Sequence, residues 1–313
     1  PRPLILAHEI INLPSASTLY SLRQQQTAAA DKLVALFTDP VFASTDPRVT
    51  QIGNAQLSQA SIAERDISNR TSIARLPSTR DEGEAIMRLV PRGQGMVATG
   101  FSANRSHVVD KDLGRFQIVH FATHGVVDTE HPELSGIILS MVNEQGSPED
   151  GFFQIHDIYN LKLSARLVVL SACSTALGKN VRGEGFIGLT RAFMYAGAQS
   201  TVASLWKVDD NATTELMRQF YDGMLNQGVS PPAALRAAQE KMWRHPRWKH
   251  PFYWAAFVIQ GEYAGTITRE PDRYSKLAKA GALTGAFILI VVGGLYLRRR
   301  LRRTNQTQTG ELA

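Results

Sequence analysis

Cysteine is almost absent from this chain: its 313 residues include a single one, Cys173. One cysteine excludes an internal disulfide framework and a cysteine-rich zinc site. The sequence also lacks the Gly-x-Ser-x-Gly motif of serine hydrolases and the Gly-Lys-Ser/Thr element of a phosphate-binding loop. We therefore expect neither of these protein classes and no metal or organic cofactor, and Cys173 becomes a position to explain.

A strong charge of one sign is also absent from most of the chain. The formal net charge is +6, but the residues from Asp272 onward hold eight Lys or Arg and only two Asp or Glu. Residues 1–271 therefore carry 26 basic and 26 acidic side chains. Because the basic excess is confined to the tail, we expect contact with a membrane rather than with nucleic acid.

The tail has the pattern of a membrane anchor. Residues 280–297 contain no charged side chain, and five of the next six residues are arginine. At about 1.5 Å per residue, a helix over 277–297 spans a hydrocarbon core of roughly 30 Å. We predict a transmembrane helix at 277–297 between a juxtamembrane linker (266–276) and a basic tail (298–313), although a buried core helix is the alternative. The positive-inside rule favours a cytoplasmic tail.

The body of the chain alternates short aliphatic runs with helical patterns. Runs that are apolar on both faces are typical of strands in a mostly parallel sheet with helices on both faces. The predicted strands are 33–37, 96–100, 117–122, 136–140, 166–171, 200–205 and 255–260. The predicted helices are 79–89, 103–111, 185–195, 210–226 and 231–243, the first of them capped by Thr79 with Glu82. We expect an α/β open sheet.

Two predicted strands end in reactive side chains. One runs into His124-Gly125 and the other into Cys173, 49 residues later. In open α/β sheets, functional groups gather beyond the carboxyl ends of the strands. If the two strands are neighbours, the imidazole and the thiol project from the same edge, which is the geometry that Cys–His nucleophilic catalysis requires.

A series of ordered motifs resembles the CHAT domains, which are caspase-like peptidase domains found beside tetratricopeptide repeats in bacteria and related to separase. The motifs are VHFATHG (119–125), LSACST (170–175), GEG (183–185), LTRAFMYAG (189–197), SLWKVDD (204–210) and HPFYWAAFVIQG (250–261). The resemblance implies a caspase-like fold over residues 1–265, a protein substrate and a regulatory region of tetratricopeptide type. CHAT domains usually carry a further strand or two before the point where this chain starts, so we expect a C-terminal fragment of a larger bacterial protein.

The resemblance also implies catalytic roles. Cys173 is the expected nucleophile, and His124 polarises the thiol or protonates the leaving amine. The backbone amides of Gly125 and Cys173 form the expected oxyanion hole.

A substrate pocket follows from the same resemblance. Residues 205–210 are similar to the separase segment in which an acid lines the pocket for a substrate arginine. Asp210 matches that acid and Asp209 is its neighbour, which implies cleavage after Arg or Lys. Lys207 stands where separase has Asp, which is a departure from the pattern.

Each of these residues also has a purely structural interpretation. A single cysteine after a buried strand is commonly a small core residue. Asp209 and Asp210 favour the N-terminus of the helix that follows them, and Glu184 either caps a helix or positions a loop near Cys173. His120, inside a strand, is expected to be a hydrogen-bonded core residue. The two functions left open are a membrane-tethered cysteine endopeptidase and a catalytically silent interaction module.

Overall fold

The computed structural model describes residues 2–24, 30–50, 73–128, 131–171, 174–175 and 184–267. The chain divides into two compact units, Pro1–Arg269 and Glu270–Ala313, and every described helix and strand belongs to the first. Among the described residues, none of the helices has the length and apolar character needed to cross a bilayer. Cys173 and the predicted transmembrane helix at 277–297 lie outside the described residues.

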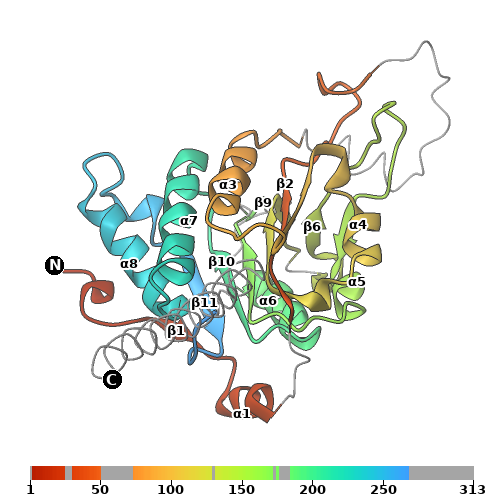
Figure 1. The fold of residues 1–313 in the computed structure, drawn as a ribbon. Helices are drawn as coiled ribbons and strands as arrows, with labels where there is room; N and C mark the ends of the chain where they lie inside the picture. The colour runs from red at the N-terminus through yellow and green to blue at the C-terminus, as the bar shows by residue number, and fades with distance from the viewer. Residues whose placement is uncertain are drawn as a thin grey trace, which may run out of the picture. The chain divides into compact units, whose positions relative to one another are not determined.

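A seven-stranded sheet forms the centre of the domain, in the order β1-β11-β10-β8-β4-β2-β3 (Figure 1). Its strands are β1 (Ile11–Asn12), β2 (Lys32–Thr38), β3 (Gly95–Thr99), β4 (Phe116–Ala122), β8 (Leu167–Leu170), β10 (Ser200–Ser204) and β11 (Phe257–Gly261). Neighbouring strands are parallel except for β10 and β11. The predicted mostly parallel sheet is therefore confirmed.

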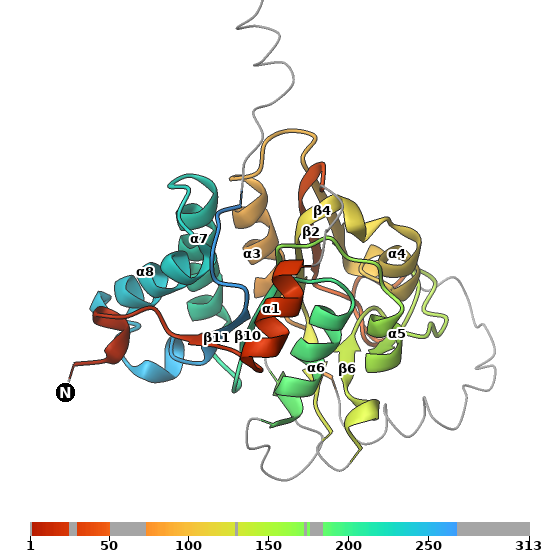
Figure 2. The same cartoon turned by 90° about the horizontal axis from the view of Figure 1, so that it is seen from below.

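Helices cover both faces of this sheet (Figures 1 and 2). One face carries α3 (Ser78–Met87), α7 (Asp210–Leu225) and α8 (Pro231–Arg244), and the other carries α4 (Arg105–Asp110), α5 (Ile155–Tyr159) and α6 (Glu184–Tyr195). Successive side chains of a strand point to opposite faces, so Leu36 enters the first core and Phe37 the second. The apolar runs arise because both faces are buried.

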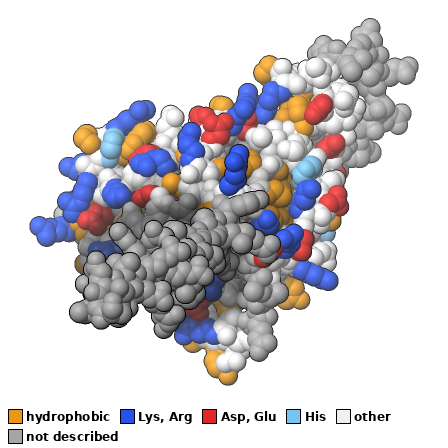
Figure 3. Space-filling view, viewed as in Figure 1, with side chains coloured by type: hydrophobic (Ala, Val, Ile, Leu, Met, Phe, Trp, Pro, Cys, Tyr) orange, Lys and Arg blue, Asp and Glu red, His pale blue; other side chains and the backbone are white. Residues whose placement is uncertain are grey.

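Shorter elements complete the domain. The helix α1 (Ala16–Gln24) lies between β1 and β2 in the chain. The 3-10 turns are η1 (Leu4–Leu6), η2 (Gly100–Ser102), η3 (Leu113–Arg115), η4 (Pro132–Leu134) and η5 (Pro251–Tyr253). On the face seen in Figure 3, basic and acidic side chains lie interspersed, in line with the balanced charge of residues 1–271.

A second, four-stranded sheet is absent from the sequence-based prediction. It consists of β5 (His124–Val126), β6 (Gly136–Ile138), β7 (Phe152–Gln154) and β9 (Ser174–Thr175), in the order β7-β6-β5-β9. The apolar run at 136–140 predicts a strand of the main parallel sheet, but its strand β6 pairs antiparallel with β5 and β7. This small sheet continues β4 past its end, with only Thr123 between β4 and β5.

The predicted cap of the first long helix is wrong. Pro77 is the N-cap residue of α3 and makes no side-chain cap bond, while Thr79 lies inside the first turn. The Thr79 hydroxyl donates to the Leu76 carbonyl at 2.7 Å and accepts from the Asp39 amide at 3.0 Å. Glu82, the expected second member of the cap, is buried in the interior. The capping pattern therefore marks residues that tie the helix to the sheet.

Candidate active site

The strand that ends before His124 and the strand that leads to Cys173 are neighbours, which meets the condition stated above for bringing the two residues to one edge. β4 and β8 are parallel, with Phe121 opposite Leu170. Beyond their ends, β5 and β9 also pair in parallel, with Gly125 opposite Ser174. The residue after His124 is thus the register partner of the residue after Cys173. The two segments come together at the carboxyl edge of the sheet, where functional groups gather in α/β folds.

The His124 imidazole is buried and held by a backbone carbonyl. The residue is 4% exposed, and Nε2 donates to the Ala74 carbonyl at 2.7 Å. A carbonyl oxygen can only accept, so Nε2 carries the proton of the neutral ring and Nδ1 keeps its lone pair. Nδ1 has no hydrogen-bond partner among the described residues. His124 is therefore prepared to accept a proton at Nδ1.

The surroundings of His124 favour its neutral form. Burial lowers the pKa of His124 below its usual 6.5, while the bond to the Ala74 carbonyl acts in the opposite direction. The nearby positive charge of Lys207 lowers this pKa further, and the negative charge of Asp210 raises it. The Phe42 ring covers the imidazole, with a centroid separation of 5.2 Å. Neutral imidazole is the form that can take a proton from a thiol.

Gly125 lies in β5, between register partners on both sides. It is opposite Ile137 of β6 and Ser174 of β9. A Cβ atom added to Gly125 would meet only the Gly136 carbonyl oxygen, at 4.0 Å, among the described atoms. Among the described residues, no atom would contact that Cβ more closely than an ordinary van der Waals distance. The predicted role of the Gly125 amide in an oxyanion hole stays a prediction.

The two predicted specificity residues occupy different environments. The Asp209 side chain accepts a hydrogen bond from the Ala212 amide at 2.9 Å and so caps α7. Asp210 instead lines a small recess, and burial followed by the negative charge of Asp209 raises the pKa of Asp210. Lys207 and His124 act on this pKa in the opposite direction. Of these two aspartates, Asp210 is the one that lines the recess.

The recess beside Asp210 reaches the end of β8. It has a volume of ≈ 10 Å³ and is lined by Leu76, Ser78, Thr79, Glu82, Ser171, Asp210 and Thr213. This volume is about the smallest that can hold one water molecule. A substrate side chain can enter only if the recess widens. Glu82 and Asp210 are the two acidic residues in its lining.

Comparison with known proteins identifies the family. The family model described as CHAT domain matches residues 1–262. The chain belongs to the CHAT domain family.

Two curated relatives of this CHAT domain are proteins named Tetratricopeptide repeat protein 28. The one from Mus musculus is 28% identical over 259 residues, and the one from Homo sapiens is 29% identical over 253 residues. These matches cover 72% and 71% of this chain but only 10% of each relative. The chain therefore spans about a tenth of the length of these relatives. They come from mouse and human, and a bacterial origin stays a prediction.

Two solved structures are similar to this CHAT domain at low identity. The Saccharomyces cerevisiae separase–securin complex has a TM-score of 0.45 at 12% identity, covering 81% of this chain and 14% of that one. The Arg-specific cysteine proteinase gingipain R has a TM-score of 0.47 at 11% identity, covering 81% of this chain and 52% of that one. Likenesses this weak do not establish a shared activity.

A buried polar cluster beneath the site is only partly predictable from the sequence. His120 is fully buried, as predicted, with Nδ1 2.9 Å from the Tyr221 hydroxyl. Its Nε2 lies 3.0 Å from Ser171 Oγ and 2.9 Å from Glu82 Oε1. Burial, followed by the negative charge of Glu82, raises the pKa of Tyr221, which stays a neutral phenol. The cluster connects α3 and α7 to the end of β8.

Two features of the CHAT domain site escape sequence-based prediction. The Ala74 carbonyl orients His124, but every residue has a carbonyl, so nothing in the residue type marks it. Glu82 does stand out in the sequence, but its spacing from Thr79 predicts a helix cap and not a buried carboxylate near the site. Within the described ranges, no three His, Cys, Asp or Glu side chains gather as a metal site.

Proposed function

We propose that this CHAT domain is a cysteine endopeptidase with a Cys173–His124 dyad. The observation that carries the proposal is the pairing of β5 with β9, which places the segments around His124 and Cys173 side by side. The hydrogen bond from His124 Nε2 to the Ala74 carbonyl supports it, because this bond leaves the Nδ1 lone pair for the thiol. Membership of the CHAT family agrees with a caspase-like peptidase site.

The proposed reaction proceeds in two stages. Nδ1 of His124 takes the proton of the Cys173 thiol, and the thiolate attacks the peptide carbonyl carbon. The amides of Gly125 and Cys173 hold the developing oxyanion, where each donor is typically worth about 10²–10³-fold in rate. His124 returns the proton to the leaving amine, and water then hydrolyses the thioester. No cofactor takes part in these steps.

The test is covalent labelling with a peptidyl acyloxymethyl ketone that carries Arg. We expect the wild-type protein to be labelled once, and Cys173→Ala to remove the label completely because the chain has no other cysteine. Labelling that persists in Cys173→Ala, or its absence from folded wild-type protein, contradicts the proposal. Absence favours the alternative of a silent interaction module.

Asp210 is proposed to select substrates cleaved after Arg or Lys. Asp210→Ala removes a partly buried carboxylate from the recess, and we expect kcat/KM for an Arg substrate to fall about 10–100-fold. Asp209→Ala is the matched control, because its carboxylate caps α7. This control is expected to lose about 1 kcal/mol of stability with the preference for Arg unchanged. Equal Arg turnover in wild type and Asp210→Ala contradicts the pocket assignment.

A membrane anchor at residues 277–297 and a tetratricopeptide-type regulatory region are further parts of the proposal. The anchor is supported by the uncharged run at 280–297 and the arginines that follow it, with the basic tail on the cytoplasmic side. The regulatory region is supported by the names of the two relatives. Retention of the full chain in membranes washed at alkaline pH, and its release when 277–313 are deleted, is the expected result for the anchor.

A further inference from the structure

Asp39 is a buried carboxylate at the end of β2, and its role is not explained by the dyad. Its side chain is 1% exposed, and its backbone has a φ of 46°, in the left-handed region that non-glycine residues rarely adopt. A buried charge and an unusual backbone conformation both carry a cost, so they persist only where surrounding contacts hold them. These contacts lead directly to the active site.

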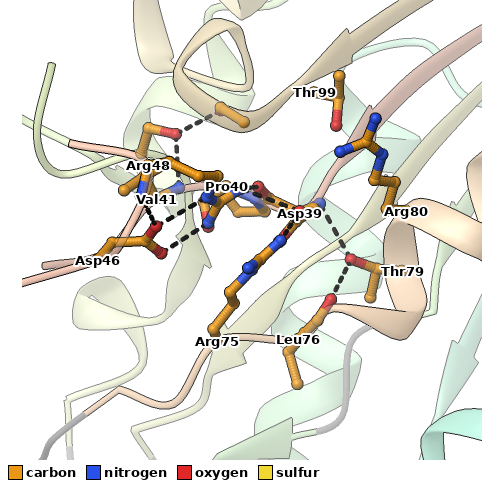
Figure 4. A network of polar contacts seen from close by, with 12 residues as sticks. Asp39, Pro40, Val41, Asp46, Arg48, Arg75, Leu76, Thr79, Arg80 and Thr99 are labelled. Atoms are coloured by element: carbon orange, nitrogen blue, oxygen red, sulfur yellow. Dashed lines mark hydrogen bonds and ion pairs between the residues drawn. The ribbon is translucent and has the colours of Figure 1, made fainter. Parts of the chain in front are cut away.

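Two arginines converge on Asp39 (Figure 4). Arg75 binds both carboxylate oxygens, with Nε 2.9 Å from Oδ1 and Nη2 2.7 Å from Oδ2. Arg48 Nη1 lies 2.9 Å from Oδ2 and donates to the Asp39 carbonyl at 2.9 Å. Arg48 is itself paired with Asp46 at 2.8 Å. Such a two-pronged arginine–carboxylate pair fixes geometry as well as adding energy.

Asp39 is also linked through Thr79 to the backbone next to Arg75. The Asp39 amide donates to Thr79 Oγ1 at 3.0 Å, and the Thr79 hydroxyl donates to the Leu76 carbonyl at 2.7 Å. The backbone around residues 74–76 is thus tied to Asp39 at two points (Figure 4). Within this segment lies the Ala74 carbonyl, which accepts from His124 Nε2.

The residues that follow Asp39 reach the other side of the imidazole. The Val41 amide donates to Ser140 Oγ at 2.9 Å, which anchors this stretch on the small sheet side of the site. One residue on, the Phe42 ring lies 5.2 Å from the His124 ring. The segment that begins at Asp39 therefore contacts the His124 ring through Phe42. The Asp39 carboxylate in turn binds Arg75, whose neighbour Ala74 accepts the hydrogen bond from His124.

We propose that Asp39 is a positioning residue for His124. Through Arg75 and Thr79 it fixes the Ala74 carbonyl, which keeps the imidazole in its Nε2–H tautomer with Nδ1 available to the thiol. The catalytic part of this inference rests on the proposed peptidase function. A displacement of about 1 Å in a reacting group can cost 10²-fold in rate, so a loosened carbonyl has a measurable effect.

The first test compares Asp39→Asn with a matched control. Asn keeps the shape of Asp39 but removes the charge that pairs with Arg75. The control is Asp157→Asn, which also removes a buried carboxylate paired with an arginine, Arg105, at 2.6 Å in a different network. We expect Asp39→Asn to lower kcat about 10–100-fold with KM nearly unchanged, and the control to leave kcat unchanged. Equal effects of the two variants on kcat would overturn the proposal.

The second test needs no peptidase activity. In ¹⁵N-histidine NMR spectra, with His124→Ala used to assign the signal, wild-type protein is expected to show the Nε2–H tautomer. Asp39→Asn is expected to show a mixture of both tautomers, and Asp157→Asn the wild-type pattern. Arg75→Lys keeps the charge but loses the two-pronged contact, and serves if Asp39→Asn does not fold. An unchanged tautomer in a folded Asp39→Asn or Arg75→Lys variant overturns the inference, whether or not the wild type cleaves peptides.

Discussion

Replacing His124 by Ala is expected to slow peptide turnover by about 10²–10⁴-fold, the usual contribution of a positioned general base. The physical reason is that Nδ1 keeps its lone pair while Nε2 is held by the Ala74 carbonyl. Steady-state kinetics with an Arg substrate measure the effect. The matched control is His131→Ala, because this histidine is 64% exposed and should leave the rate unchanged. A rate loss shared by both variants contradicts the role of His124.

The pH profile of Cys173 alkylation is a second measurement that tests the role of His124 as a base. Burial holds the pKa of His124 below 6.5, so its neutral form persists as the pH falls to that value. The alkylation rate of the wild type is therefore expected to stay high down to pH 6.5 and to fall only below it. In His124→Ala the rate should follow an ordinary thiol, with a pKa of about 8.5. Coincident profiles would show that His124 does not act on Cys173.

Stability should follow the same titration. The unfolded chain binds a proton at His124 with a pKa of about 6.5, whereas the folded protein binds it only at lower pH. Between the pKa of His124 in the folded protein and its pKa of about 6.5 in the unfolded chain, the unfolded chain therefore binds more protons. The stability that neutral His124 contributes is thus present above pH 6.5 and is lost as the pH falls through the folded-state pKa. Urea unfolding of wild type and His124→Ala between pH 7 and 5 measures this difference.

The main sheet could be predicted because its strands are buried on both faces. In β2 and β4, nearly every side chain lies in one of two cores, and this leaves an unbroken apolar run in the sequence. His124 and Cys173 are the first reactive residues after two of these apolar runs, and they therefore indicate where the strands end. Parallel neighbours place those ends at one edge, which is why the dyad could be proposed from the sequence.

The parts of the site that the sequence does not predict depend on backbone groups and distant pairs. Strands β5, β7 and β9 are two or three residues long, which is too short to show a periodicity. The pair formed by Asp39 and Arg75 joins residues 36 positions apart and has no local pattern. Glu82 has the pattern of a cap residue because Thr and Glu at this spacing commonly form one. Only tertiary packing against His120 turns its side chain inward.

Phe121→Ala is expected to cost about 3–5 kcal/mol of stability, the usual range for removing a fully buried aromatic side chain. Phe121 is fully buried in β4, and its ring stacks on Phe37 at a centroid distance of 5.0 Å and contacts Phe193 of α6 at 5.5 Å. Its loss leaves a cavity between the sheet and α6. Domains of this kind are stable by only about 5–15 kcal/mol, so the change is large.

Urea unfolding measures this loss as a lower midpoint at an unchanged m value. Tyr20→Ala is the control, because Tyr20 is 67% exposed and its removal should change stability by less than about 0.5 kcal/mol. Phe121 precedes His124 by three residues, so the Phe121→Ala variant also shows whether a loss of stability changes the reactivity of Cys173. The folded fraction of Phe121→Ala should keep the wild-type pH profile of Cys173 alkylation, since the bond from His124 to Ala74 lies outside this core. A stability loss below about 1 kcal/mol would contradict the packing of β4 against α6.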